Sequence, residues 1–138
     1  MADITLYNPN ENKQQAIMTF SANTLEERKR LFNMTQSPDK QLGDCIGDVI
    51  NIKDVYVEVV NVKNSRKIKD TDPDYVEAPR CILIDTDGVS YSCTSSGIYN
   101  ALVRMFNILG MPTWEEGVPV KVKQINKGQL RILTLEMQ

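Results

Sequence analysis

Apolar and polar residues alternate along residues 46–62, and a period of two is typical of a β-strand. Ile50 and Ile52 fall on one side of the alternation, whereas Val55 and the valines at alternate positions after it fall on the other. Because successive side chains of a strand point to opposite faces, this change of side near Lys53 predicts a β-bulge or a sharp bend. The stretch therefore predicts one long, bent strand of the kind that turns the corner of a small barrel.

Shorter strands are predicted after it, arranged as two hairpins. They cover residues 81–84, 89–94, 118–123 and 130–135. Asp87-Gly88 separates the first two and Asn126-Lys127-Gly128 separates the last two, and both are turn sequences because glycine tolerates positive φ. Residues 63–79, before the first hairpin, are polar and contain Pro73 and Pro79, so we expect a long loop there.

Two helices are predicted, each from a cap. Thr24-Leu25-Glu26-Glu27 is a capping-box sequence and predicts a helix that ends near Asn33. Its apolar contacts are expected to be Leu25, Leu31 and Phe32. A second helix begins at Ser95 or Ser96 and ends at Gly110. One apolar stripe runs along it, formed by Ile98, Leu102, Met105, Phe106 and Leu109.

The order strand, strand, strand, helix, strand, strand is that of an OB-type five-stranded barrel. We therefore expect a mainly β fold in which residues 45–138 form an OB-type barrel with a helix between strands 3 and 4. Residues 1–44 are expected to form an N-terminal extension that packs on the barrel, with the short helix and a short strand at residues 16–20. The whole chain is then a single domain. A generic α+β domain would give the same order and stays open as an alternative.

Catalytic and metal-binding chemistry is poorly represented in the chain. There is no histidine, which removes Ser-His-Asp and Cys-His catalysis together with the commonest metal ligand. Asp70, Asp72 and Asp74 alternate as at the start of a calcium loop, but the glycine and glutamate of that motif are missing. We therefore expect no enzyme, no metal and no cofactor.

The sequence also indicates where the protein works. No apolar run approaches the about 20 residues that span a bilayer, and the start lacks the pattern of a secretory signal. Cys45, Cys81 and Cys93 are odd in number and lack Cys-x-x-Cys spacing, so free buried thiols in a reducing compartment are expected. The prediction is a cytoplasmic protein.

Charge placement is the main functional signal. With 16 basic and 18 acidic side chains the net charge is −2, which is unusual for a nucleic-acid-binding protein, but local charge matters more than the sum. Two basic clusters stand out: Lys63, Arg66, Lys67 and Lys69 between the first two barrel strands, and Lys121, Lys123, Lys127 and Arg131 around the last hairpin. In an OB barrel these two places flank the ligand groove, where phosphates of a single strand would lie. Ordinary solvated lysines are the other interpretation.

Base stacking requires exposed aromatic rings beside that charge. Tyr56 has polar neighbours, Asp54 and Glu58, on its side of the long strand, so we expect it to be exposed. Tyr75 lies in the polar loop near the first basic cluster. The pattern around Tyr91 leaves open whether its ring belongs to the core or to the ligand surface.

These residues resemble a known family, the single-stranded DNA-binding proteins of small tailed bacteriophages that replicate by protein priming. The resemblance covers nearly the whole chain and rests on an ordered series of short motifs. They are Phe20, Thr24-Leu25-Glu26, Leu31-Phe32-Asn33, Gly47 to Ile50, Asp87-Gly88-Val89-Ser90-Tyr91-Ser92, Val120-Lys121-Val122-Lys123-Gln124, Lys127-Gly128 and Leu133-Thr134-Leu135. The polar insert from Lys63 to Ala78 departs from the pattern.

The resemblance implies an OB barrel that coats displaced single strands independently of sequence during phage DNA replication, without catalysis. In that family tyrosines stack on bases, and the motif places Tyr91 on one of them; Tyr56 corresponds approximately to another. Single-stranded DNA is the expected partner, phage replication proteins are further candidates, and the location is the cytoplasm of the infected host. The alternative is a protein-binding module, which the acidic stretch Asp70 to Glu77 favours.

Overall fold

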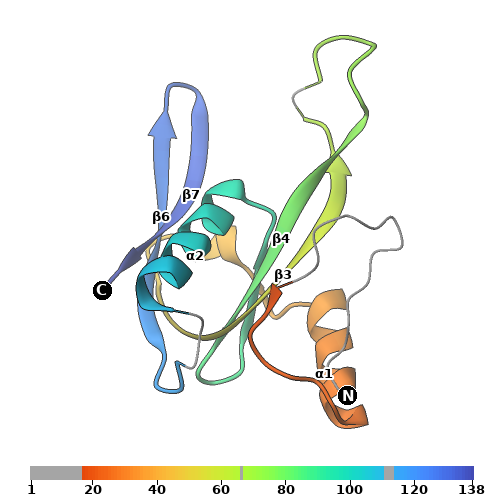
Figure 1. The fold of residues 1–138 in the computed structure, drawn as a ribbon. Coiled ribbons are helices and arrows are strands. Elements are labelled where there is room, and N and C mark those ends of the chain that lie inside the picture. Colours follow the sequence, from red (N-terminus) through yellow and green to blue (C-terminus); the bar gives the residue numbers. More distant parts are fainter. Residues whose placement is uncertain (1–16, 66, 111–113) are drawn as a thin grey trace.

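The computed structural model describes residues 17–65, 67–110 and 114–138, and Figure 1 shows how the chain is folded. The elements in chain order are β1 (Ile17–Met18), α1 (Leu25–Gln36), β2 (Lys40–Gln41), a 3-10 turn η1 (Leu42–Cys45), β3 (Val49–Lys63), β4 (Tyr75–Asp85), β5 (Ser90–Cys93), α2 (Ser96–Leu109), β6 (Val118–Lys127) and β7 (Leu130–Met137). The protein is mainly β, as predicted.

All strands belong to one sheet in the order β2-β5-β4-β3-β6-β7, and β1 pairs with β3 outside this path. The five strands from β3 to β7, with helix α2 between β5 and β6, follow the predicted order. The predicted change of side in β3 is confirmed, because its register with β4 shifts between Ile52 and Asp54. β5 and β7 are not paired with each other in the described part of the chain, so the sheet is curled but open, and a closed five-stranded barrel is not seen.

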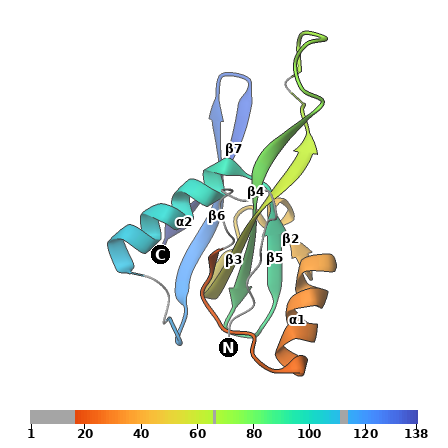
Figure 2. The ribbon, with the colours of Figure 1, turned by 45° about the vertical axis from the view of Figure 1, so that its right-hand side comes forward.

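Helix α2 fills the opening of the curled sheet between β4 and β7 (Figures 1 and 2). Its buried face consists of Ile98, Leu102 and Met105, and Ser95 caps its first turn. The start of the helix lies directly on β7, where a Cβ on Gly97 would come within 2.1 Å of the Leu133 carbonyl oxygen. The absence of a side chain at Gly97 therefore allows the start of the helix to lie against the backbone of β7.

The described residues form two apolar clusters, one on each side of the central strands. The larger lies inside the curled sheet and includes the free, buried thiols Cys45, Cys81 and Cys93, as expected. The smaller lies between the outer face of β3–β4 and α1, and consists of Ala22, Leu31, Tyr56, Ile82 and Ile84. The middle of β3 is therefore buried on both faces.

Helix α1 begins as predicted, with both hydrogen bonds of the Thr24–Glu27 capping box. It continues to Gln36, beyond the predicted end at Asn33. The expectation that Leu25 and Phe32 contact the core is wrong, because they are 67% and 61% exposed and only Leu31 is buried. The helix contacts the sheet along one narrow line.

The prediction of a loop over residues 63–79 is wrong for its second half. β4 begins at Tyr75 and pairs with β3 as far as Lys63, so only residues 64–74 form the loop. Pro79 is tolerated because it lies beyond the part of β4 that pairs with β5, where β4 has a free edge.

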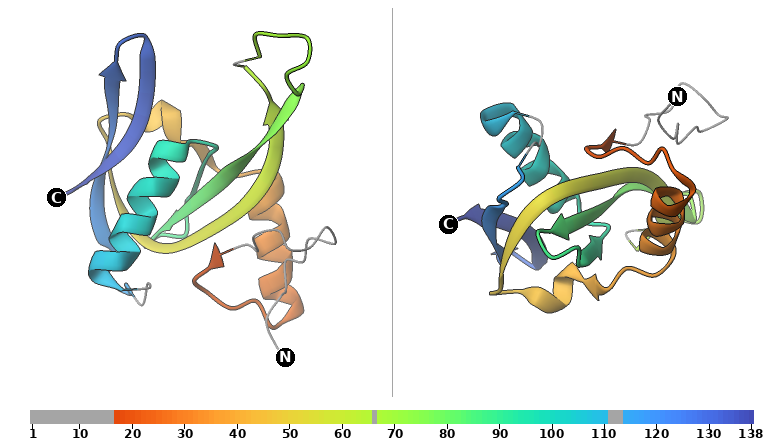
Figure 3. Two further views of the ribbon diagram at one scale, coloured as in Figure 1. Left: turned by 45° about the horizontal axis from the view of Figure 1, so that its top comes forward. Right: turned by 90° about the horizontal axis from the view of Figure 1, so that it is seen from below.

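Two hairpins extend beyond the core on the same side of the molecule (Figures 1 and 3). We call them the β3–β4 arm (residues 59–79) and the β6–β7 arm (residues 123–134). The two arms flank the same end of the curled sheet (Figures 1 and 3), and we call the region between them the mouth of the sheet.

We expect Gly97→Ala to lower the free energy of unfolding by about 1–3 kcal/mol, because the new methyl group would overlap the Leu133 carbonyl. Urea unfolding followed by circular dichroism measures the change. Gly43→Ala is the matched control, since nothing lies within 4 Å of the position a Cβ would take there. Equal stability of the Gly97 variant and the wild type would contradict the close contact.

Candidate nucleic-acid interface

Lys63 and Tyr75 lie directly opposite each other at the outer end of the β3–β4 arm. Both are exposed, and the Tyr75 side chain is the most exposed aromatic of the described residues at 64%. Lys63 has the same parity as Val55 and Val57, whose side chains lie in the larger cluster, so Lys63 and Tyr75 lie on the core-side face of the arm. An aromatic face beside an ammonium group is what a stacked base and its phosphate require.

The basic residues of the β6–β7 arm are divided between its two faces. Arg131 lies opposite Asn126, on the side that carries Val120 and Val122 in the core. Lys121, Lys123 and Lys127 lie on the other side, where Lys123 forms an ion pair with Glu136 at 3.3 Å. The predicted cluster of four therefore divides, and only Arg131 shares the core-side face that leads to the mouth.

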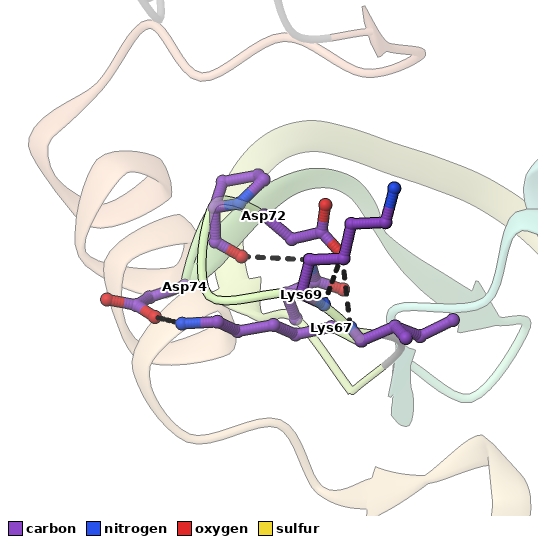
Figure 4. Close-up of polar contacts among 7 residues, drawn as sticks. Lys67, Lys69, Asp72 and Asp74 are labelled. Carbon is purple, nitrogen blue, oxygen red and sulfur yellow. Dashed lines mark hydrogen bonds and ion pairs between the residues drawn. The ribbon is translucent and has the colours of Figure 1, made fainter.

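The loop of the β3–β4 arm is not the open basic cluster that was expected. Lys67 forms an ion pair with Asp74 at 2.5 Å. The Asp72 carboxylate accepts hydrogen bonds from the backbone N–H groups of Ile68 and Lys69 at 3.0 Å each, as Figure 4 shows. These two bonds lower the pKa of Asp72. Charge within the loop is thus largely used to hold the loop together, and Arg66 lies outside the described residues.

The expectation that Tyr56 is exposed is wrong, since only 1% of the residue is accessible. Its ring lies in the smaller apolar cluster beneath α1, and its hydroxyl donates to Glu58 Oε1 at 2.8 Å. Glu58 also forms an ion pair with Arg80 at 3.2 Å. Burial is the main cause that raises the pKa of Tyr56, and the hydrogen bond to Glu58 adds to it. Stacking on this ring would require α1 to leave the sheet.

Tyr91 belongs to the larger core and is 8% exposed. Its hydroxyl donates to Asp85 Oδ2 at 3.0 Å, and the Lys40 ammonium lies 5.8 Å from the centre of its ring. Burial, followed by the bond to Asp85, raises the pKa of Tyr91 to about 12. Of the two possibilities that the pattern left open, the structure shows a core position, and the ring presents no free face.

Two further aromatic residues pack against each other. Phe106 and Trp114 are in contact, with ring centroids 6.1 Å apart, which agrees with the place of Phe106 on the predicted apolar stripe of the helix. Phe32 was expected to pack but is exposed on α1, and the sequence held no signal for this beyond its basic neighbours. The sequence placed Asn126 in the turn, whereas it belongs to β6 and lies opposite Arg131 in the register of the hairpin.

The tyrosine–lysine pair of one arm and the arginine of the other are groups of the kind that stack on bases and contact phosphates. The model of a family described as phage single-stranded DNA-binding protein matches residues 10–138. The chain belongs to this family, and it binds and coats single-stranded DNA in phage replication. Comparison with curated proteins gave no match, and comparison with solved structures gave none. Neither of the two helices of the described part is long and apolar enough to cross a membrane.

We expect Tyr56→Ala to lower the free energy of unfolding by about 3–5 kcal/mol, the range for removal of a large buried ring. Thermal or urea unfolding of the purified variant measures the loss. Tyr99→Ala, which removes a partly exposed ring, serves as the control and should cost less. A Tyr56→Ala protein as stable as the wild type would contradict the buried position.

The buried tyrosines also predict how stability depends on pH. The pKa of Tyr91 is raised in the folded protein to about 12, whereas an unfolded tyrosine titrates near about 10. The stabilising contribution of the neutral hydroxyl is therefore complete below pH about 10 and is lost as the pH rises toward about 12. We expect Tyr91→Phe to lose stability less steeply than the wild type over this interval, in urea unfolding measured at successive pH values. Identical slopes would contradict the prediction.

Proposed function

We propose that a single strand of DNA crosses the mouth between the two arms, with bases stacked on Tyr75 and phosphates beside Lys63 and Arg131. The observation that carries the proposal is the exposed Lys63–Tyr75 pair on the core-side face of its arm. Arg131 occupies the equivalent face of the other arm. Both arms extend from strands that enclose the same core, so one strand of DNA could contact both.

The remaining basic residues have secondary roles in this proposal. Lys123 and Lys127 lie on the outer face of the β6–β7 arm, and Lys121 lies on the same face of β6 nearer the core. There they attract DNA and hold the phosphates that flank the mouth. Lys67 is partly neutralised by Asp74 and contributes less. Tyr56 and Tyr91 support the strands from the two apolar clusters. This assignment replaces base stacking on these two rings, which their burial opposes.

Stacking and phosphate contacts do not distinguish one base from another, so the proposed binding is independent of sequence. The proposal is of a non-catalytic protein without a cofactor that works in the cytoplasm of the infected host. The strand order and the helix between β5 and β6 support an OB-type arrangement with α2 inserted at its open side. The boundary between an N-terminal extension and a barrel at residue 45 stays a prediction.

The alternative of a protein-binding module depended on the acidic stretch Asp70 to Glu77. Two carboxylates of this stretch, Asp72 and Asp74, are bonded within the loop. They are therefore less available for a partner than their spacing in the sequence indicates.

We expect Tyr75→Ala to weaken binding of labelled oligo-dT about five- to 150-fold, the equivalent of about 1–3 kcal/mol for one stacked base. Fluorescence titration at low salt measures the affinity. Val76→Ala is the matched control, because Val76 is the next residue of the same strand and lies on its opposite face. Unchanged affinity of a folded Tyr75→Ala protein would contradict the proposed platform.

The salt dependence of binding provides a separate test of the charges. Each phosphate contact that is lost should reduce the slope of log affinity against log salt by about 0.7. We expect this reduction for Arg131→Ala and for Lys63→Ala. Lys29→Ala is the control, since Lys29 lies on α1 and is paired with Glu26. A slope for Arg131→Ala equal to that of the control would exclude Arg131 from the DNA path.

A further inference from the structure

A second surface feature lies between α2 and the edge of β7, where the β6–β7 arm joins the core. It is a groove of about 330 Å³ lined by Gly97, Ala101, Arg104 and Ile108 of the helix and by Leu135 and Met137 of the strand, among other residues. Ile108 is 69% exposed and Met137 is 45% exposed. Large apolar side chains gathered in one groove are typical of a binding surface.

The strand that borders this groove has an unpaired edge. In an antiparallel pair, residues alternate between those that bond across the pair and those whose N–H and C=O groups point away. The Gln138 N–H donates to the Pro119 carbonyl at 3.0 Å, so residues of the same parity as Gln138 bond to β6. Leu135 and Met137 have the other parity, and their backbone groups point away from β6 toward the groove.

The start of α2 limits how much of this edge is available. Gly97 lies against the Leu133 carbonyl and covers the edge there. β7 is the last strand of the sheet order, so no described strand pairs with Leu135 or Met137 on this side. The free edge therefore consists of the last residues of β7, and the groove extends along it.

A second copy of this chain fits the edge poorly if it pairs through its own β7. Antiparallel pairing of the available groups would set Leu135 opposite Met137 of the other copy. Glu136 would then lie opposite its own equivalent, and like charges directly opposite each other destabilise a sheet. The strand that pairs with this edge is therefore expected to be a segment other than β7 of a second copy.

Arg104 indicates the charge of that segment. It is the only charged side chain that lines the groove, it is exposed, and no ion pair between it and another described residue is found. An apolar groove with one free guanidinium favours an apolar segment that carries a carboxylate.

We propose that the groove binds an extended, acidic–apolar segment of another protein, which adds to β7 as a strand. The segment bonds to the backbone of Leu135 and Met137, rests apolar side chains on Ala101 and Ile108, and places a carboxylate on Arg104. Strand addition of this kind gives affinity through the backbone and specificity through alternate side chains. The surface lies apart from Tyr75 and Lys63, so a partner protein and DNA could be bound together. The proposal does not depend on the DNA path described above.

The test uses the full-length protein and a short fluorescein-labelled peptide in which valine alternates with threonine and one threonine is replaced by aspartate. We expect saturable binding by fluorescence anisotropy, and slower amide exchange at Leu135 and Met137 in NMR spectra of the complex. The same peptide with every second amide N-methylated should not bind, because it cannot complete the strand pairing. Absence of binding by the unmodified peptide, or no change in exchange at these two amides, would overturn the proposal.

Variants of α2 separate the groove from the rest of the surface. Arg104→Glu should weaken the peptide about tenfold and should favour a peptide with lysine in place of aspartate. Asn107→Glu is the control, since Asn107 is exposed on the same helix outside the groove. Both variants should bind oligo-dT as the wild type does. Equal peptide affinities of the two variants, or loss of oligo-dT binding by Arg104→Glu alone, would contradict the proposed site.

Discussion

The structure depends on the pairing of β3 with neighbours along both of its edges. This strand of 15 residues pairs with β4 along one edge and with β1 and β6 along the other. The register shift between Ile52 and Asp54 lets it belong to the curled sheet at one end and to the β3–β4 arm at the other. Because one strand forms both, the position of Lys63 and Tyr75 relative to the core is set by backbone geometry and needs no additional domain or loop.

Burial on both faces of β3 determines which tyrosines can meet DNA. Val55 and Val57 point into the larger cluster and Tyr56 into the smaller one, beneath α1. The faces of the central sheet are thus used for stability, and the exposed tyrosine of the β3–β4 pair, Tyr75, lies where the strands leave the core. The chain can be acidic overall because the proposed DNA contacts are few and local, with Lys63 beside Tyr75 on one arm and Arg131 on the other.

Local signals allowed much of the fold to be predicted from the sequence. The capping box at Thr24, the turn at Asp87-Gly88 and the bulge after Ile52 each depend on a few neighbouring residues, and each is found. The strand order followed from them. That the sheet stays open could not be predicted, because this depends on contacts between segments far apart in the chain, such as that of Gly97 with Leu133.

The candidate site was harder to predict because its residues act through distant partners. Tyr56 has polar neighbours that indicated exposure, but Asp54 accepts a hydrogen bond from Thr19 and Glu58 is paired with Arg80, so their charges are satisfied at a covered surface. The basic residues of the last hairpin are close together in the sequence, but the pairing of β6 with β7 places Arg131 on the opposite face from the lysines. In both cases the decisive information is cross-strand register, which alternation along one strand does not contain.

In the described part of the chain the β3–β4 arm is a ribbon of two strands, and this has a consequence for how such proteins can vary in length. Adding or removing one matched pair of residues would turn Tyr75 to the α1 side of the ribbon, whereas changes by two pairs would preserve its orientation apart from the twist. Natural variation in the reach of this hairpin should therefore proceed in even steps, and the length of DNA covered by each molecule would change in discrete increments.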